Sequence, residues 1–305
     1  MTDAAVNPLK AGLEDVVVSP SEICFIDGRK GRLIYRGYDV DDLVAHSTFE
    51  EVTFLLWQGR LPSRKELDAH VKALGATANR KLPPKLIAML RMLPRKTTPM
   101  EVIRTGVSAL SAFDPDAADN SREATLRKSL RLTAQLPTLV AAWERIRRGR
   151  PPIAPNARLN LAGNFLYMMS GKPPTPLAAK TFDTALILHA DHEFNASTFA
   201  ARVTAATLSD LHSAVVSGIG ALKGPLHGGA NEQVMLMVEK IKDPARAEAW
   251  IRKALADKAR IMASATGCTG WRTRGPSISS AWRSSSGSRW ATPARCRSWT
   301  PSSGW

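Results

Sequence analysis

The composition of the chain changes abruptly between Met262 and Ala263. Residues 263–305 contain no Asp, Glu, Lys, Leu, Val, Met or Phe, but they hold 11 Ser, five Trp and one Ile. A segment of this composition cannot present the continuous apolar face that a packed helix needs, so we expect it to be disordered or loosely collapsed. The folded core must therefore come from the residues before position 263.

Before that boundary, hydrophobic periodicity predicts a mainly α-helical fold with a small N-terminal β-hairpin. The hairpin is predicted within residues 21–40, where two short apolar runs flank the turn-like sequence DGRKG. We expect Ser197 and Thr198 to cap the helix predicted at 197–209. Small residues should let the helix predicted at 210–224 pack closely against its neighbours. The predicted helical segments are 48–74 with a break at 59–63, 98–113, 121–150 with a break near Pro137, 151–190 as two helices around a turn at 170–175, 197–209, 210–224 with the small residues Ser213, Ser217, Gly218 and Gly220, and 231–241.

The sequence also argues against several classes of protein. No apolar run approaches the ~18 residues that a transmembrane helix needs, and the N-terminus has early charges in place of a signal-peptide core. Three widely spaced cysteines, Cys24, Cys268 and Cys296, form neither a disulfide framework nor a zinc ligand set. We therefore expect a cytoplasmic protein that does not bind a membrane.

The net charge of +15 raises the question of nucleic-acid binding. Six of the positive charges are arginines after residue 262, where no acid occurs, so the rest of the chain carries +9. Those charges are scattered, which is typical of a basic solvated surface and also suits small anionic substrates. No nucleic-acid partner is expected from this pattern.

Two histidine-bearing segments carry the candidate chemistry, LHADHEFNAST at 188–198 and GPLHGGANE at 224–232. The first has the order H-x-x-H-E, which differs from the H-E-x-x-H of zinc proteases, and no metal site is predicted. In the second, a glycine-flanked turn places His227 at a helix N-terminus, where partial positive charge disfavours imidazolium. A neutral imidazole can donate a hydrogen bond to a developing enolate oxygen, although a structural role for His227 is also open.

The two segments together resemble the paired signature of citrate synthases. Residues 12–43, which run from GLEDVVVSP to RGYDVDDL, and residues 99–116, PMEVIRTGVSALSAFDPD, are similar to further family segments. The resemblance implies an almost wholly helical two-domain fold that works as a homodimer. It places a large domain at residues 1–227, the start of a small domain at 228–262, and a non-native tail at 263–305.

Membership of that family implies an acyltransferase that condenses oxaloacetate with acetyl-CoA to give citrate, the first step of the tricarboxylic acid cycle. Acetyl-CoA is then a co-substrate, and no cofactor is bound permanently. The resemblance assigns His227 as catalytic, because the matching histidine hydrogen-bonds the thioester oxygen and stabilises the enol. It assigns His192 and Asn195 to substrate binding, together with arginines whose forked donors match carboxylates. His189 is left as structural.

The family continues with a motif similar to GFGHRVYR, which holds the ketone-polarising histidine, and its catalytic aspartate comes later still. Neither occurs in this chain. If one base is deleted from GC-rich codons for GFGHRVYR, the new frame reads ASATGCTG, which is residues 263–270. Continuing through VEDPRAKHL gives WRTRGPSI, which is residues 271–278. We therefore predict a frameshift after Met262, negligible citrate formation, and partial exposure of apolar residues in the truncated small domain, namely Val234, Leu236, Met237 and Ile241.

Three alternatives remain open at this point. A 2-methylcitrate synthase would take propionyl-CoA in place of acetyl-CoA. A pseudoenzyme would keep only the half of the site that binds oxaloacetate. A nucleic-acid-binding module would use the Arg, Ser and Trp residues of the tail, which can stack on bases.

Overall fold

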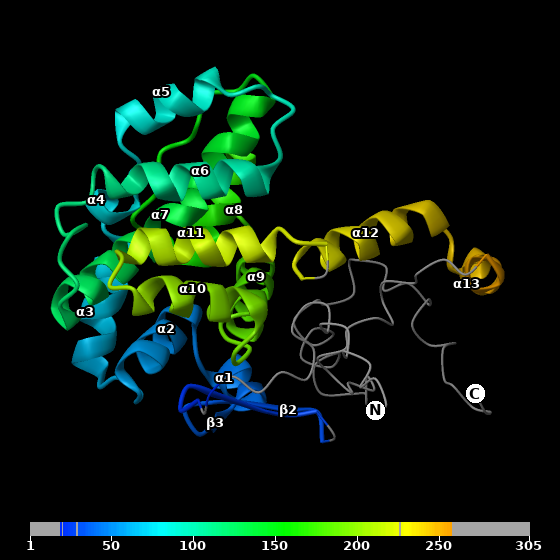
Figure 1. The fold of residues 1–305 in the computed structure, drawn as a ribbon, viewed down its shortest axis with the longest axis horizontal. Coiled ribbons are helices and arrows are strands. Elements are labelled where there is room, and N and C mark those ends of the chain that lie inside the picture. The colour runs from blue at the N-terminus through cyan, green and yellow to red at the C-terminus, as the bar shows by residue number, and fades with distance from the viewer. Residues whose placement is uncertain (1–18, 20, 29, 226, 258–305) are drawn as a thin grey trace, which may run out of the picture.

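A computed structural model describes residues 19, 21–28, 30–225 and 227–257, and these form a mainly helical protein with one small sheet (Figure 1). The predicted fold class is therefore confirmed for this part of the chain. The expectation for residues 263–305, and the frameshift on which it depends, lie outside the described residues.

The N-terminal sheet is antiparallel, with the strand order β1-β2-β3. Its strands are β1 (Cys24–Asp27), β2 (Arg32–Tyr35) and β3 (Tyr38–Asp39). Cys24 lies opposite Tyr35 in the register, and both side chains are buried. The predicted hairpin is thus confirmed, whereas the third strand β3 and the short helix that follows it were not predicted.

Thirteen α-helices and one short 3-10 helix follow in the described part of the chain. Their bounds are α1 (Val40–His46), α2 (Phe49–Gln58), α3 (Arg64–Gly75), α4 (Thr77–Arg80), α5 (Pro84–Met92), α6 (Pro99–Ser111), α7 (Arg122–Arg147), α8 (Leu161–Ser170), α9 (Pro176–Leu188), α10 (Ala196–Ala206), α11 (Leu211–Leu222), α12 (Gly229–Ile241), η2 (Pro244–Arg246) and α13 (Ala247–Ala256).

Helix α7 lies at the centre of the larger core cluster, where it packs against α5, α6 and α11. Leu139 and Trp143 of α7 are almost fully buried there. Gly106 of α6 makes this packing close, because a Cβ atom at that position would lie only 2.6 Å from Leu139 Cδ2. A second cluster joins the sheet to α1, α2 and the end of α9.

The predicted break at Pro137 is wrong, because α7 runs unbroken from residue 122 to residue 147 with Pro137 inside it. A proline in a helix interior removes one backbone hydrogen bond and costs about 3 kcal/mol. Buried residues lie on both sides of it, including Leu132 and Leu139, and each fully buried leucine contributes about 1.5–3 kcal/mol. Packing of both halves against the same core therefore outweighs the local preference.

The expectation that Ser197 and Thr198 cap a helix is also wrong. The N-cap of α10 is Asn195, whose Oδ1 accepts hydrogen bonds from the backbone N–H groups of both residues at 3.0 Å. Asparagine at an N-cap satisfies donors that the first helical turn leaves unpaired. The sequence offers three polar residues within positions 195–198, and only the geometry of the preceding loop decides among them.

Helix α11 packs between α10 and α6 (Figure 1). The predicted role of small residues is confirmed for two positions of α11. A Cβ atom on Gly218 would lie 3.3 Å from the Ser197 carbonyl oxygen, and the Thr204 hydroxyl donates to Ser217 Oγ at 2.8 Å. Around Gly220, by contrast, nothing lies within 4 Å of an added Cβ atom.

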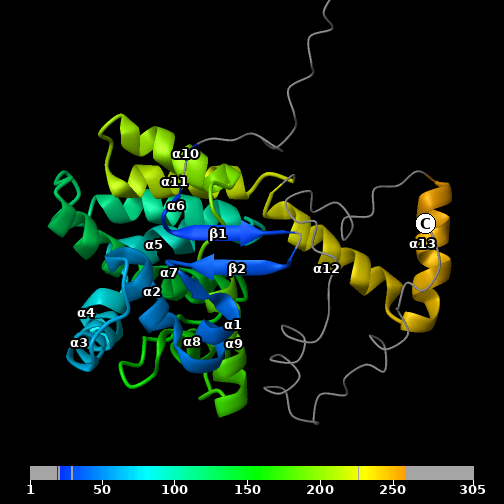
Figure 2. The same cartoon turned by 90° about the horizontal axis from the view of Figure 1, so that it is seen from below.

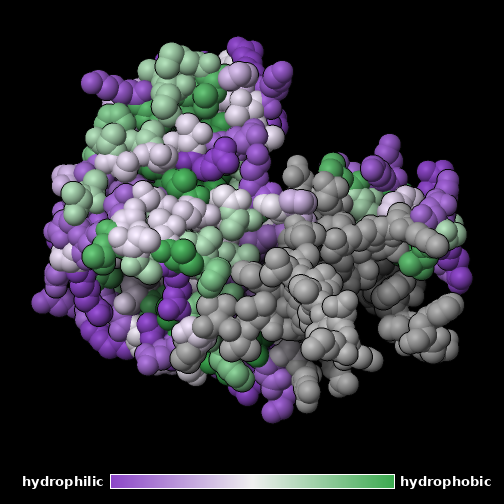
Figure 3. All heavy atoms as spheres, viewed as in Figure 1, coloured by the Kyte–Doolittle hydropathy of each residue, from purple (hydrophilic) through white to green (hydrophobic). Residues whose placement is uncertain are grey.

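Helices α12 and α13 extend away from the helical body in both views (Figures 1 and 2). Leu236 of α12 is 41% exposed, and Met237 and Ile241 are partly exposed, which agrees with the expected exposure of these apolar residues. The burial of Val234 lies outside what the structure describes. In Figure 3, hydrophobic side chains also reach the surface of the body between hydrophilic ones. A domain boundary near Gly228 remains a prediction.

Candidate functional site

His227 lies in a tight turn between α11 and α12. Its backbone N–H donates to the Gly224 carbonyl at 3.0 Å, and the N–H of Gly229 donates to the same oxygen at 3.2 Å. Gly228 is required for this turn, because an added Cβ atom would lie 2.6 Å from the Leu222 carbonyl oxygen. The imidazole is therefore held directly before the first turn of α12, as the glycine-flanked sequence predicted.

The His227 imidazole is half-buried and has one polar neighbour that sequence analysis did not identify. Its Nε2 lies 2.8 Å from the hydroxyl of Ser197, at the start of α10. Burial lowers the pKa of His227, and the nearby His192 lowers it further. Both effects favour the neutral imidazole, in agreement with the sequence expectation, although the larger cause is burial rather than the helix terminus considered there.

Ser197 reaches His227 because two features fix the start of α10. The Asn195 cap fixes the first turn of the helix, and the close crossing at Gly218 brings α11 against it. At the C-terminal end of α11, Lys223 donates to Glu101 of α6 at 3.0 Å, which ties the residues before the turn to the body. The serine and the histidine are thus 30 residues apart in sequence but in direct contact.

The loop that carries His192 is anchored on the N-terminal sheet. Glu193 adopts a positive φ of 55°, and its Oε1 accepts a hydrogen bond from the N–H of Ile26 at 2.8 Å. The buried Tyr35 hydroxyl lies 3.1 Å from the carbonyl oxygens of Ile187 and Asp191. Burial raises the pKa of Tyr35, so the phenol stays protonated and able to donate. This anchoring leaves the His192 side chain exposed beside His227.

The other candidate ligands of this region are used in local structure. His189 ends α9, and its Nδ1 lies 2.7 Å from the Ala185 carbonyl oxygen, which fits the structural role expected for it. The Asp191 carboxylate accepts the N–H of Glu193 at 3.0 Å. Within the part of the chain that the structure describes, no three His, Cys, Asp or Glu side chains gather in a way that could hold a metal ion.

Of the three predicted site residues, His192 lies close enough to His227 to affect its pKa. Asn195 lies on the same segment, but its side-chain oxygen is occupied by the backbone of α10. Ser197 joins the site instead. The only sequence signal for it was a hydroxyl residue soon after the DHE segment, and that signal also fits a helix cap.

Chemically, this arrangement offers a neutral imidazole with one ring nitrogen fixed by a hydroxyl. Because the Ser197 contact occupies Nε2, the nitrogen left for a ligand is Nδ1. If the serine hydroxyl donates to Nε2, the ring proton resides on Nδ1, which can then donate to an oxygen on the ligand. His192 is close enough to affect the pKa of His227 and supplies a further donor. Arg202 of α10 packs over the Phe194 ring, with its Cζ 4.5 Å from the ring centroid.

No helix among the described residues has the length and apolar character that crossing a bilayer would require.

The free thiol of Cys24 in strand β1 is buried, and this burial and the charge of Asp191 raise its pKa to about 12. A thiol with so high a pKa is a poor nucleophile, so the chemistry of this region rests on the imidazoles.

Comparison with known proteins extends this picture. The family model described as "Citrate synthase, C-terminal domain" matches residues 12–263. A citrate synthase from Haloferax volcanii is 47% identical over 259 residues, which cover 83% of this chain and 68% of the relative. A 2-methylcitrate synthase from Mycobacterium tuberculosis is also 47% identical, over 83% of this chain and 64% of that protein.

The fold comparison agrees with the sequence comparison. The citrate synthase of Thermoplasma acidophilum, solved in a ternary complex with carboxymethyl coenzyme A and oxaloacetate, has a TM-score of 0.72 and 33% identity to this chain. The match covers 82% of this chain and 65% of that one. The chain thus spans about two thirds of the length of the proteins that it matches.

Proposed function

Because this chain belongs to the citrate synthase family, a family of acyltransferases, we propose that its His227 region is the enol-stabilising part of a site that condenses oxaloacetate with acetyl-CoA. Water then releases citrate and CoA. In this proposal the protein acts in the cytoplasm, uses acetyl-CoA as a co-substrate and has no permanently bound cofactor.

The observation that supports this proposal most is the contact between Ser197 and His227. Removal of a methyl proton from the thioester moves negative charge onto the thioester oxygen. A neutral imidazole can donate a hydrogen bond from its ring N–H to that oxygen and thereby stabilise the enol. The lowered pKa of His227 and the hydroxyl on its Nε2 together supply a neutral ring in a fixed orientation.

We assign oxaloacetate to the neighbouring residues of the DHE segment. His192 is exposed and lies close enough to His227 to affect its pKa, so a carboxylate bound there would lie beside the thioester. Asn195 retains a proposed place in this pocket through its amide nitrogen, since its oxygen caps α10. The Thermoplasma acidophilum relative, whose structure contains oxaloacetate and a coenzyme A analogue, supports this substrate class by similarity.

We further propose that this chain binds oxaloacetate but turns it over at a negligible rate. Residues 263–305 contain no His, Asp or Glu, so they supply neither a proton-abstracting carboxylate nor a histidine to polarise the ketone. Each such group contributes ~10²–10⁴-fold to catalysis. Restoring the proposed reading frame from residue 263 should supply both.

The test uses the chain as given and the frame-restored chain side by side. Calorimetry should show oxaloacetate binding to the given chain, and His192→Ala should weaken it about tenfold. His46→Ala is the matched control, because His46 is an exposed histidine at the end of α1. Citrate formation should appear only in the frame-restored chain. Family-typical turnover by the given chain would contradict the proposal, as would an intact frame at the locus with no missing base.

A second candidate function is 2-methylcitrate synthesis from propionyl-CoA. It is favoured by one observation, namely that a 2-methylcitrate synthase and a citrate synthase share the same 47% identity with this chain. The ratio of kcat/KM for acetyl-CoA and propionyl-CoA on the frame-restored chain decides between them. A ratio above ten in favour of propionyl-CoA would reverse our assignment.

We also propose that the protein is a homodimer. Exposed apolar residues on α10 and in the loop that follows it, Val203 at 53% and Leu208 at 81%, support a protein partner on this face. Sedimentation of the purified chain should give twice the monomer mass. A strict monomer at tens of micromolar would contradict this assignment.

A further inference from the structure

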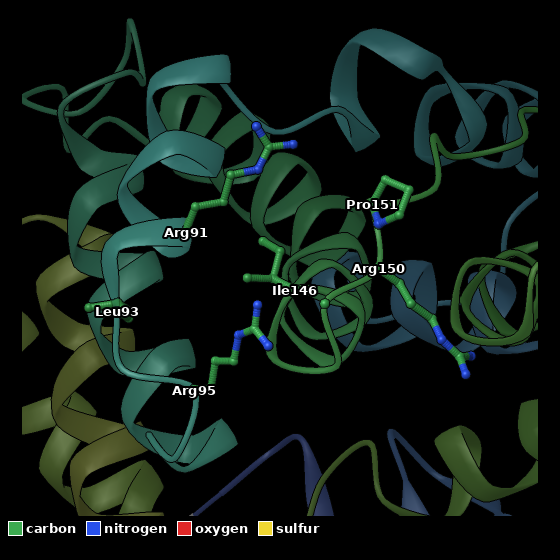
Figure 4. Close-up of a pocket in the computed structure, with 7 residues that line it drawn as sticks. Arg91, Leu93, Arg95, Ile146, Arg150 and Pro151 are labelled. Carbon is green, nitrogen blue, oxygen red and sulfur yellow. The ribbon is translucent and has the colours of Figure 1, made fainter.

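A hollow of about 360 Å³ lies at the junction of α5, the loop that follows it, and the C-terminal end of α7. Arg91, Leu93 and Arg95 line one side, and Ile146 with the 149–151 loop lines the other (Figure 4). A volume of this size is within the range of small-molecule sites. None of its lining residues belongs to the His192 or His227 segments, so the hollow is separate from the site proposed above.

The charged side chains that line this hollow are all positive. Arg91, Arg95 and Arg150 all line it, no acidic residue does, and the described part of the chain gives none of the three an ion pair. The neighbouring arginines differ in this respect, since Arg147 and Arg148 both pair with Glu144. Positive side chains that line one hollow without a carboxylate favour an anionic ligand.

Two helices end here, which makes the concentration of positive charge tolerable. The C-terminal carbonyls of α5 and α7 carry partial negative charge and offset part of the repulsion between the guanidinium groups. The loop is also fixed: the N–H of Arg150 donates to the Arg145 carbonyl at 2.8 Å, and Arg145 Nε donates to the Pro151 carbonyl at 2.6 Å. Because the N–H groups of residues 149 and 150 are used internally, an anion must be recognised by the arginine side chains.

The arginines do not contribute equally. Figure 4 shows the Arg91 and Arg95 side chains extending from the α5 side, with Arg95 directed towards Ile146, while the Arg150 side chain points away from both. Arg95 lies across Gly149, where an added Cβ atom would be 3.6 Å from its Nη1. Gly149 has a φ of 72°, so glycine suits both the backbone and the approach of the guanidinium.

We propose that this hollow binds a small, multiply charged phosphate anion, with Arg91 and Arg95 as the principal ligands and Arg150 as a weaker contributor at the rim. Guanidinium groups match phosphate oxygens with two parallel hydrogen bonds each, so a diphosphate can engage both principal arginines at once. Leu93 and Ile146 supply the apolar part of the wall. A singly charged anion cannot satisfy both arginines and should bind much more weakly.

Calorimetric titration of the full chain with inorganic pyrophosphate at low ionic strength tests this proposal. We expect saturable binding that Arg91→Ala and Arg95→Ala each weaken about tenfold, whereas Arg150→Ala weakens it by less. The matched control is Arg104→Ala, which removes an exposed arginine of α6 that lies outside the hollow and forms no ion pair within the described residues. It should change the affinity less than twofold. The arginines of the hollow are exposed, so these variants should keep the fold, and far-UV circular dichroism checks this.

Several results would overturn the proposal. The first is an absence of saturable binding. The second is unchanged affinity in both Arg91→Ala and Arg95→Ala. The third is an equal loss in Arg104→Ala, which would mean that pyrophosphate senses only the net positive charge of the protein. Acetate provides a further arm, and binding of acetate as tight as that of pyrophosphate would also contradict a site built for multiple charges.

Discussion

The hydroxyl of Ser197 lies 2.8 Å from Nε2 of His227, and this contact joins the first turn of α10 to the turn that precedes α12. Neither residue alone defines a site. Together they hold an imidazole with one nitrogen occupied and the other free, next to a second histidine on the segment anchored by the N-terminal sheet. The proposed enol stabilisation rests on this pair.

Replacing Ser197 tests its role in positioning the imidazole. In the frame-restored chain, Ser197→Ala should lower kcat about 10–100-fold, because the ring loses the partner that selects its tautomer, while KM for oxaloacetate changes little. Ser197→Thr keeps a hydroxyl and should recover most of the loss. Equal kcat values for the alanine variant and the parent chain would show that the contact has no role in the reaction.

Asn195 has two assigned functions, and substitutions can separate them. Asn195→Ala removes the cap of α10 and should destabilise the fold by about 1 kcal/mol in urea unfolding. Asn195→Ser retains a capping oxygen but removes the amide nitrogen. If the amide contacts oxaloacetate, the serine variant should keep its stability and lose substrate affinity. Full affinity in a stable serine variant would leave Asn195 with the capping role alone.

The buried His212 predicts how stability depends on pH. It is 1% exposed, its Nε2 lies 3.5 Å from Asp114 and its Nδ1 lies 3.6 Å from Asp210, with Lys128 and Arg131 also nearby. Burial lowers its pKa and outweighs the two carboxylates, so the ring is neutral in the folded state. The unfolded chain therefore binds the extra proton first as the pH falls below the ordinary histidine pKa of about 6.5.

It follows that His212 contributes to stability above that pH and that this contribution is lost on acidification. The free energy of unfolding should decrease from pH 7.5 to pH 5.5, by at most about 1.4 kcal/mol per pH unit from this residue. His212→Gln should flatten the dependence, provided that both proteins unfold in one transition. An increase in stability towards pH 5.5 that the variant abolishes would mean that His212 is charged and paired with Asp114.

Two glycines make a matched pair for the packing of the helical body. Gly106→Ala places a methyl group 2.6 Å from the fully buried Leu139 and should destabilise the protein by about 1–3 kcal/mol. Gly220→Ala meets no atom within 4 Å and should stabilise α11 by about 0.5–1 kcal/mol. Urea unfolding measures both. Equal effects of the two substitutions would contradict the close crossing of α6 and α7.

Local sequence patterns were sufficient where the determinant lies within a few residues. The turn DGRKG predicted the hairpin, and the predicted segment 98–113 agrees with α6, where the Glu101 carboxylate accepts from the Thr98 backbone and hydroxyl at 2.9 Å. The glycine-flanked turn around His227 could also be predicted from the sequence, because the glycines are needed for local backbone contacts.

Long-range contacts could not be predicted from local sequence patterns. Glu193 binds Ile26 across 167 residues, and Ser197 contacts His227 only because α10 and α11 cross closely. Pro137 has the opposite character, since its local signal is strong but the surrounding core overrides it. The family resemblance supplied the proposed roles of His192 and His227, whereas the contact between Ser197 and His227 required the structure.

The neutral, serine-bound state of His227 can be measured most directly by ¹⁵N NMR of the histidine-labelled chain, with His227→Gln to assign the signal. We predict a pKa below 6.5, a single dominant tautomer at pH 7.5, and loss of that tautomeric preference in Ser197→Ala. A pKa at or above 6.5, or a tautomer ratio that Ser197→Ala leaves unchanged, would contradict the account.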